Sequence, residues 1–302
     1  MPPAASTPVQ TQPTVASLRA GQEVDLLLAC TRKERLLARS GTAYLALELR
    51  DRSGAITARA FRDADVLAGR FERGDLLRVC GSVQRFRDEL QLEVRTLVRA
   101  PDADPAAFLP VAYRDLDELD GFLEHLAGEV FEAGCARLLS ALLADDVLRA
   151  AWRRAPCTRT GHHAYLGGLL EHTVAVGTLA LETAQLHPRL DRDLLLTAAL
   201  VHDVGKTREF TYGADIGLSD EGRLVGHVEL GLRLLDERAA GIELAADRRL
   251  ALAHCVLTHH GPDAAPGRRF ALPEALALYR LNALDATVKQ ALEHGLVPGA
   301  WP

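Results

Sequence analysis

The segment His202-Asp203-Val204-Gly205-Lys206 places a histidine beside an aspartate directly after the apolar run Leu194 to Val201. The run predicts a buried helix that ends near Gly205, because glycine is favoured just past a helix end. A carboxylate buried in such a place is costly unless it is paired. Either a metal ion held by both side chains or a local hydrogen bond or cap from Asp203 would supply the pairing. Residues elsewhere in the chain must decide between these alternatives.

Further histidines and one aspartate recur at the ends or on the apolar faces of other predicted helices. They are His172, His227, His254, the pair His259-His260, and Asp285. Any one of them alone would be read as a core histidine with a hydrogen-bond partner. As a set they indicate a metal site, since imidazoles and carboxylates from separate helices converge in the cores of helical bundles. Such mixed nitrogen and oxygen ligands suit Mn, Fe, Co, Ni or Zn better than Ca.

These residues require a helical second half of the chain. Apolar residues keep helical spacing from Asp115 onward, and no alternating strand pattern returns before the C-terminus. The expected helices are one carrying His172 to about Leu186, one ending at His202-Asp203, one opening at His227, one stopped by Gly261-Pro262, and one from Pro273 to Leu292. We therefore expect an all-α domain over residues 115–302.

The front of the chain, residues 15–100, consists of short alternating segments separated by turns. The expected strands are Val24–Cys30, Tyr44–Asp51, Ala55–Phe61, Leu76–Val83 and Leu90–Val94. With a short helix expected over Asp63–Phe71, this order fits a five-stranded OB β-barrel. Another small barrel used only for assembly is the alternative. The fold class predicted is α+β multidomain, with the barrel followed by the all-α bundle.

Basic and aromatic side chains on a barrel of this kind grip phosphates and stack on bases. The candidates, taken as a group, are Arg32, Lys33, Arg35, Tyr44, Arg59, Phe61, Arg85 and Phe86. Each alone would be read as a solvated charge or a core aromatic. From Val15 to Ala100 there are 16 Lys+Arg against 12 Asp+Glu, a balance of +4 in a chain whose formal net charge is −6. That distribution fits a polyanion-gripping module joined to an acidic, histidine-rich one.

The composition of the chain limits the class of protein and the cellular compartment that can be expected. Hydrophobic residues make up 48% and charged residues 25%, as in soluble globular proteins. The five cysteines lack CxxC spacing, which excludes a structural zinc finger and is typical of buried thiols in a reducing compartment. With no secretory signal and no membrane span in the sequence, we expect a cytoplasmic protein. Residues 1–14 are expected to be a disordered tail and the proline-rich residues 101–114 a linker.

The front half resembles the OB-fold domains that bind single-stranded nucleic acid. The matching features are Gly41-x-x-Tyr44-Leu45, Leu49-x-Asp51-x-x-Gly54, Gly74-Asp75, Gly81-x-Val83 and Leu90-Gln91-Leu92. In the second half, the order His172, His202-Asp203, Asp285 on successive helices resembles the HD phosphohydrolase superfamily. His227 and the pair His259-His260 extend the pattern to the form that can hold a second metal ion.

This resemblance implies roles for the individual residues. One ion would be ligated by His172, His202, Asp203 and Asp285. Asp203 would bridge to a second ion on His227, His259 and His260, and Lys206 would stand beside the substrate phosphate. Asp203 and Lys206 would then be the residues that take part directly in catalysis.

A narrower family matches nearly the whole chain. The segments His162-His163-Ala164-Tyr165, Gly168-Leu169-x-Glu171-His172, Gly226-His227 and Leu284-Asp285-Ala286 resemble the YhaM-type 3′→5′ exoribonuclease family, which carries an OB fold ahead of an HD domain. Two positions depart from that family's pattern. It often has an acid where this chain has Asn282 and an arginine where this chain has Thr287, which leaves the substrate preference open.

The resemblance implies a metal-dependent 3′→5′ exonuclease of single-stranded RNA, with single-stranded DNA as a further substrate. It implies one or two divalent transition-metal ions, manganese first, with Fe, Co, Ni or Zn as alternatives. Two other functions stay open: an HD-type nucleotidase or cyclic-nucleotide phosphodiesterase, and a non-catalytic factor that binds single strands around a structural metal. No membrane partner is expected, and a homo-oligomer is allowed.

Overall fold

The computed structural model describes residues 13–38, 40–104, 107–261 and 269–295. These residues form two compact units. The first extends to Leu109 and also includes Tyr212–Ile216, and the second comprises Pro110–Thr211 and the chain from Gly217 onward. The disordered tail predicted over residues 1–14 falls mainly on residues 1–12, which lie outside the described ranges. None of the helices within those ranges is long and apolar enough to cross a membrane.

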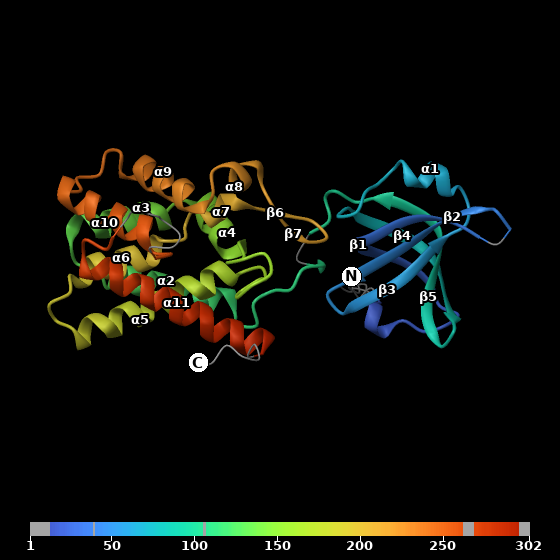
Figure 1. Ribbon diagram of the computed structural model, residues 1–302, viewed down its shortest axis with the longest axis horizontal. Helices are drawn as coiled ribbons and strands as arrows, with labels where there is room; N and C mark the ends of the chain where they lie inside the picture. The colour runs from blue at the N-terminus through green and yellow to red at the C-terminus, as the bar shows by residue number, and fades with distance from the viewer. Residues whose placement is uncertain (1–12, 39, 105–106, 262–268, 296–302) are drawn as a thin grey trace, which may run out of the picture. The chain divides into compact units, whose positions relative to one another are not determined.

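The first unit contains a closed five-stranded barrel (Figure 1). Its strands are β1 (Glu23–Leu37), β2 (Ala43–Asp51), β3 (Gly54–Ala60), β4 (Leu76–Phe86) and β5 (Glu89–Arg99). They follow the order β1-β2-β3-β5-β4, and β4 closes the barrel against β1. The β3–β5 pair is parallel and the other pairs are antiparallel. The predicted five-stranded barrel, with the short helix α1 (Ala64–Ala68) after its third strand, is confirmed.

Alternation of side chains explains the barrel. In β2, Leu45, Leu47 and Leu49 are buried, while the residues between them are only partly covered. Because successive side chains of a strand point to opposite faces, these leucines enter the barrel core together. A 3-10 turn, η1 (Val15–Ser17), adds Val15 to the same core. The first strand is longer than predicted: β1 continues to Leu37, with a register shift between Cys30 and Arg32.

A short hairpin contributes to the barrel unit. It consists of β6 (Phe210–Tyr212) and β7 (Ile216–Leu218). Ala214, between these strands, is buried with Phe108, Ala29 and Leu76. The prediction of an all-α second half is wrong at this hairpin, because strands of three residues each are too short to give a detectable alternation. Phe108 lies in the range predicted as a linker, and it is 2% exposed.

Apart from β7 and part of β6, the described elements of the second unit are helices. They are α2 (Leu116–Gly128), α3 (Ala133–Leu143), α4 (Asp146–Arg154), α5 (Gly168–Leu186), α6 (Arg192–Val201), α7 (Lys206–Glu209), α8 (Asp220–Leu224), α9 (His227–Ala239), α10 (Ala246–Thr258) and α11 (Pro273–His294). All eight residues from Leu194 to Val201 are buried. A helix that is apolar on every side belongs in a core, and α6 is packed by α2, α3, α5, α10 and α11.

Side-chain caps fix where several helices begin. Asp115, Glu132, Asp145 and Asp191 stand just ahead of α2, α3, α4 and α6, and each accepts hydrogen bonds from backbone N–H groups of the first turn. Those N–H groups have no partner within the helix, so the caps stabilise the helix starts, typically by about 1 kcal/mol each. The cap at Asp191 therefore sets the position of α6 and of the residues that follow it.

Candidate metal centre

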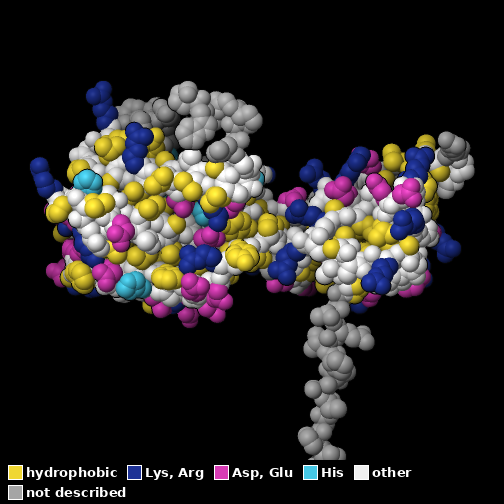
Figure 2. Space-filling view, turned by 90° about the horizontal axis from the view of Figure 1, so that it is seen from below, with side chains coloured by type: hydrophobic (Ala, Val, Ile, Leu, Met, Phe, Trp, Pro, Cys, Tyr) yellow, Lys and Arg dark blue, Asp and Glu magenta, His cyan; other side chains and the backbone are white. Residues whose placement is uncertain are grey.

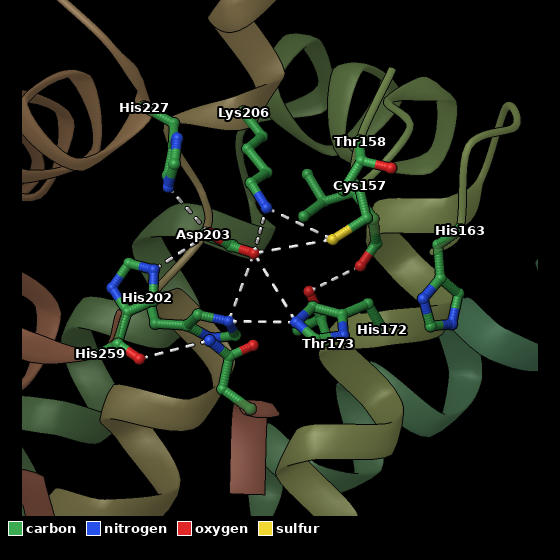
Figure 3. A network of polar contacts seen from close by, with 12 residues as sticks. Cys157, Thr158, His163, His172, Thr173, His202, Asp203, Lys206, His227 and His259 are labelled. Carbon is green, nitrogen blue, oxygen red and sulfur yellow. Dashed lines mark hydrogen bonds and ion pairs between the residues drawn. The ribbon is translucent and has the colours of Figure 1, made fainter. Parts of the chain in front are cut away.

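Helix α6 carries His202 and Asp203 into the core of the helical unit. The helix ends at Val201, and the backbone N–H of His202 still donates to the carbonyl oxygen of Ala198. His202 is fully buried and Asp203 is 2% exposed. A carboxylate in that position must be satisfied by neighbouring groups. Figure 3 shows side chains from several elements converging on Asp203.

One oxygen of Asp203 faces a first pair of histidines. Its Oδ2 atom lies 3.3 Å from Nε2 of His202 and 3.6 Å from Nε2 of His172, which is carried by α5. The two Nε2 atoms are themselves 3.3 Å apart. His172, His202 and Asp203 thus form a buried group of three donors that could hold an ion.

The other oxygen of Asp203 faces a second group. Its Oδ1 atom lies 3.4 Å from Nε2 of His259 and 3.5 Å from Nε2 of His227. His260 approaches the same place, with its Nε2 atom 2.8 Å from Nε2 of His227. Asp203, His227, His259 and His260 form a second group of donors close enough to hold an ion. Asp203 is therefore shared, with one oxygen toward each group.

Two atoms of this second group are buried without any hydrogen-bond partner: Oδ1 of Asp203 and Nε2 of His259. Unpaired buried polar atoms are rare, because each costs the free energy of its lost hydration. A cation between them would satisfy both at once. The residues present therefore fit a divalent metal ion of the nitrogen- and oxygen-preferring class.

The outer nitrogen of four imidazoles contacts an oxygen. The Nδ1 atom of His202 lies 2.8 Å from the carbonyl oxygen of Ala199. The Nδ1 atom of His259 lies 2.6 Å from the carbonyl oxygen of Val256. The corresponding partners are Asp285 Oδ2 at 2.6 Å for His172 and Glu209 Oε1 at 3.2 Å for His227. A proton held on Nδ1 by an acceptor leaves the lone pair on Nε2, toward the centre. This is how histidine ligands are oriented in metal sites.

Asp285 contacts His172, one of the residues with which it was predicted to ligate an ion. The resemblance implied that it ligates the first ion with His172 and His202. In the structure it contacts the Nδ1 edge of His172, which is the edge opposite the nitrogen facing His202. It also lies 3.8 Å from Nδ1 of His163. In this arrangement Asp285 orients His172, and His163, His172 and Asp285 also offer one donor atom each within 4.8 Å of one another, a group that could hold an ion.

Lys206, which the resemblance predicted to stand beside the substrate phosphate, is buried next to Asp203. It is 5% exposed, and its ammonium donates to Oδ2 of Asp203 at 2.7 Å and to the sulfur of Cys157 at 3.3 Å. Burial disfavours charge on Asp203, but the Lys206 ammonium and His202 outweigh it and hold the pKa of Asp203 well below its usual range. Burial also opposes charge on Lys206, yet Asp203 and Cys157 raise the pKa of Lys206. Both side chains are thus ionised, and Lys206 keeps Asp203 an anion.

His172 and His259 are neutral near pH 7. Burial lowers the pKa of His172 to about 3 and the pKa of His259 to about 4. A neutral imidazole is the form that binds a metal. The centre therefore combines a carboxylate fixed as an anion with imidazoles fixed as neutral donors.

Gly205 explains why His227 reaches Asp203. A Cβ atom at position 205 would lie 2.0 Å from the carbonyl oxygen of His227. Only glycine allows the backbone at the start of α9 to come so close. Gly205 has ordinary helical angles, with φ at −64°. Glycine is therefore needed at position 205 for the close approach of the two backbones, and not to end α6, which already ends at Val201.

On the barrel, four of the predicted nucleic-acid-binding residues lie together. The Arg59 guanidinium is 5.6 Å from the ring centroid of Tyr44 and 5.0 Å from that of Phe86. The rings of Tyr44 and Phe61 are 5.3 Å apart. Phe61 and Phe86 are 44% and 45% exposed. We call Tyr44, Arg59, Phe61 and Phe86 the aromatic–arginine cluster.

The other four predicted residues have different surroundings. Lys33 donates to the carbonyl oxygens of Ala68 and Phe71 and is thereby tied to the end of α1. Arg32 pairs with Glu34, and Arg35 pairs with Asp65. Arg85 is exposed. Lys and Arg side chains are interleaved with acidic ones over the face of the barrel seen in Figure 2, so charge alone does not mark a single binding patch there.

Comparison with known proteins matches both units. Residues 169–287 match the HD domain family, and residues 30–98 match the OB-fold nucleic acid binding domain family. The chain is 27% identical over 288 residues to the 3′-5′ exoribonuclease YhaM of Bacillus subtilis, covering 93% of this chain and 91% of that protein. It is 26% identical to the YhaM of Listeria monocytogenes serotype 4b over 89% of this chain and 86% of that one. The YhaM of Shouchella clausii is 27% identical over 94% and 90% of the two chains.

The chain is thus similar along most of its length to the YhaM-type 3′-5′ exoribonucleases. The matches span both units, with the OB fold ahead of the HD domain as the family resemblance implied. Of the two departures from the YhaM-type pattern, Asn282 is buried and its side-chain amide donates to the carbonyl oxygen of His259 at 3.3 Å. It therefore helps to position a candidate ligand, while Thr287 is exposed.

Three site residues were missed or misjudged from the sequence. Cys157, taken for an ordinary buried thiol, lies with its sulfur 3.7 Å from Oδ2 of Asp203. Glu209 was not considered, although it contacts His227. His163 is 1% exposed and has a positive φ of 52°, which is uncommon for a residue with a side chain. Its place in the YhaM-type motif His162-His163-Ala164-Tyr165 was the available signal.

Proposed function

We propose that this chain is a metal-dependent 3′→5′ exonuclease that hydrolyses phosphodiester bonds in single-stranded RNA. The observation that carries the proposal is Asp203, a buried carboxylate whose two oxygens face two separate groups of histidines. Divalent ions bound there would lower the pKa of a water molecule and offset charge at phosphorus. Manganese is the ion we expect, and Fe, Co, Ni and Zn suit the same donors.

The residues of the chain prepare this site in three ways. Lys206 keeps Asp203 ionised, so that both carboxylate oxygens remain acceptors. Burial keeps His172 and His259 neutral, with their Nε2 atoms toward Asp203. The acceptors on the Nδ1 side, among them Asp285 and Glu209, fix the orientation of the rings. A pre-oriented donor set of this kind needs little rearrangement when it binds a cation.

The substrate and polarity are argued from the relatives and the barrel. The relatives are named 3′-5′ exoribonucleases and share most of their length with this chain. The aromatic–arginine cluster offers exposed ring faces and one guanidinium, which suit base stacking in a single strand. We propose that the barrel binds single-stranded RNA and that single-stranded DNA can replace it. The five cysteines are free, which agrees with action in the reducing cytoplasm.

The test is digestion of 5′-labelled single-stranded RNA and DNA with each divalent ion in turn, resolved to single nucleotides. A shortening ladder that needs both a metal and a free 3′ hydroxyl supports the proposal. Asp203→Asn should abolish the ladder, and His125→Ala, at an exposed histidine of α2, should leave it unchanged. Immediate release of the 5′ label or cutting of a circular strand would contradict the polarity. Hydrolysis of mononucleotides alone would point instead to a nucleotidase.

A further inference from the structure

The segment between α4 and α5 forms a tight loop beside the candidate metal centre. The backbone N–H of Cys157 donates to the carbonyl oxygen of His163 at 3.1 Å, which closes the loop. Inside it, the Thr158 hydroxyl donates to the carbonyl oxygen of His162 at 2.8 Å and accepts from the N–H of Gly161 at 2.9 Å. The loop is therefore built to hold Cys157 and His162 in fixed positions.

Contacts to α5 and α11 hold this loop in place. A Cβ atom on Gly168 would lie 2.2 Å from the carbonyl oxygen of His163, so a glycine is needed where α5 begins. The backbone N–H of His163 donates to Oε2 of Glu293, on α11, at 3.0 Å. These contacts bring one nitrogen or sulfur atom each from Cys157, His162 and His172 within 4.8 Å of one another.

The group Cys157, His162 and His172 differs in its chemistry from the other candidate groups of the described residues. It offers a sulfur and two imidazole nitrogens, whereas the groups around Asp203 offer only nitrogen and oxygen. Sulfur ligands select thiophilic ions, and zinc binds both cysteine sulfur and histidine nitrogen. We infer that Cys157, His162 and His172 form a binding site for a thiophilic divalent ion such as Zn²⁺, and that an ion held there inhibits the enzyme.

Inhibition follows because His172 belongs both to this group and to the first group around Asp203. Its Nδ1 atom contacts Asp285, so a single Nε2 atom remains for a metal. That atom faces His202 in the first group around Asp203, and it cannot ligate two ions at once. An ion on Cys157 and His162 therefore removes His172 from the set that supports hydrolysis. This step of the inference rests on the proposed metal-dependent function.

Binding of the ion exchanges one proton for one metal–sulfur bond. The S–H bond of Cys157 breaks, the Zn–S bond forms, the proton passes to solvent, and no electron is transferred. Burial raises the pKa of Cys157 to about 12, so the thiol gives up its proton only as the metal–sulfur bond forms. The Lys206 ammonium donates a hydrogen bond to the sulfur at 3.3 Å, a contact that stabilises the thiolate. The neighbouring carboxylate of Asp203 adds further negative charge beside the incoming cation.

The test uses Co²⁺ as a visible substitute for Zn²⁺ in the full-length protein. Wild type and Cys30→Ala, which changes an equally buried thiol of the barrel, should both show a thiolate-to-cobalt charge-transfer band in the near ultraviolet. Cys157→Ser preserves the size and hydrogen bonding of the side chain and should lack the band. Cys157→Ala provides a second variant without sulfur and should lack it too.

Inhibition is measured separately, as the Zn²⁺ concentration that halves each variant's own Mn²⁺-supported rate. It should rise at least about tenfold in Cys157→Ser, which corresponds to about 1.4 kcal/mol of binding free energy. Bound cobalt without a charge-transfer band in wild type would overturn the inference and leave the proposed function standing. A band or a zinc sensitivity that is unchanged in Cys157→Ser would overturn it as well. If elemental analysis finds no bound cobalt at all, the metal-dependent function itself is contradicted.

Discussion

The histidine centre of the helical unit and the aromatic–arginine cluster of the barrel show two different ways of building a functional surface. His172, His202 and His259 are fully buried, and the Nδ1 atom of each ring contacts an oxygen. Phe61 and Phe86 are almost half exposed, and the Arg59 guanidinium lies over the ring of Phe86. A buried polar group must be paired, so its geometry is fixed by its neighbours. An exposed one can adapt to a ligand and tolerates change.

The largest effect should come from removing the shared ligand or its neighbour. We expect Asp203→Asn and His202→Ala each to lose the bound transition metal and nearly all turnover. Both side chains belong to the same buried group of candidate metal ligands. The apolar residues of α6 should keep the helical unit folded. Elemental analysis and helical circular dichroism measure the two properties. Unchanged metal content in both variants would show that the ion binds elsewhere.

A smaller effect should come from the groups behind the ligands. Asp285→Asn and Glu209→Gln remove the charged acceptors of His172 and His227 while keeping an oxygen in place. Loss of such an outer partner typically lowers metal affinity or activity about 10–100-fold. Metal titrations monitored by activity measure it, with Glu182→Gln on the exposed side of α5 as the control. If Asp285→Asn loses all of its bound metal and Glu209→Gln does not, Asp285 is a direct ligand of the ion.

The barrel should respond more gently and in two separable ways. Phe86→Ala should weaken binding of single-stranded RNA by about 1–3 kcal/mol if one base stacks on it, with the salt dependence unchanged. Arg85→Ala removes an exposed charge and should reduce the slope of log affinity against log salt by about 1 if it contacts a phosphate. Binding isotherms at several salt concentrations separate the two. If both variants give the same binding isotherms as wild type, the barrel does not hold the strand through these residues. That result would favour a role of the barrel in assembly.

The same contrast explains what the sequence could predict. The ordered set His172, His202-Asp203, His227 and His259-His260 was predicted as one centre, because polar residues at the ends of apolar helices must meet a common partner. The alternation in β2 and its neighbours likewise predicted the barrel. Both signals arise from burial, which leaves a periodic trace in the sequence.

What could not be predicted depends on side-chain orientation and on loops. Spacing places Asp285 on α11 near the centre but does not show which edge of the His172 ring it contacts. Cys157 reaches Asp203 through a loop closed by backbone contacts, which no periodicity records. Lys33 was grouped with Arg59 by charge, yet its ammonium bonds carbonyl oxygens at the end of α1. The short strands β6 and β7 were missed for a similar reason.

The smallest effect should come from an exposed charge pair of the barrel. Arg78 of β4 and Asp25 of β1 are joined by hydrogen bonds of 2.7 and 2.8 Å, with side chains 57% and 47% exposed. The hydrogen bonds from Arg78 lower the pKa of Asp25. A carboxyl whose pKa falls on folding stabilises the protein above its unfolded pKa, and this contribution is lost as the pH falls through the folded pKa. Exposure and salt limit the contribution of such pairs to about 0–1 kcal/mol.

Asp25→Asn should therefore lower the free energy of unfolding of the barrel by less than about 1 kcal/mol at pH 7. The difference between variant and wild type should shrink as the pH is lowered below the usual carboxyl range, where the wild-type aspartate is protonated as well. Urea unfolding followed at both pH values, at low and high salt, measures it. Arg52→Gln, at an exposed arginine in the turn between β2 and β3, is the matched control for loss of one charge. A difference that grows toward low pH would reverse the assigned direction of the pKa shift, because the pair would then stabilise the protonated form.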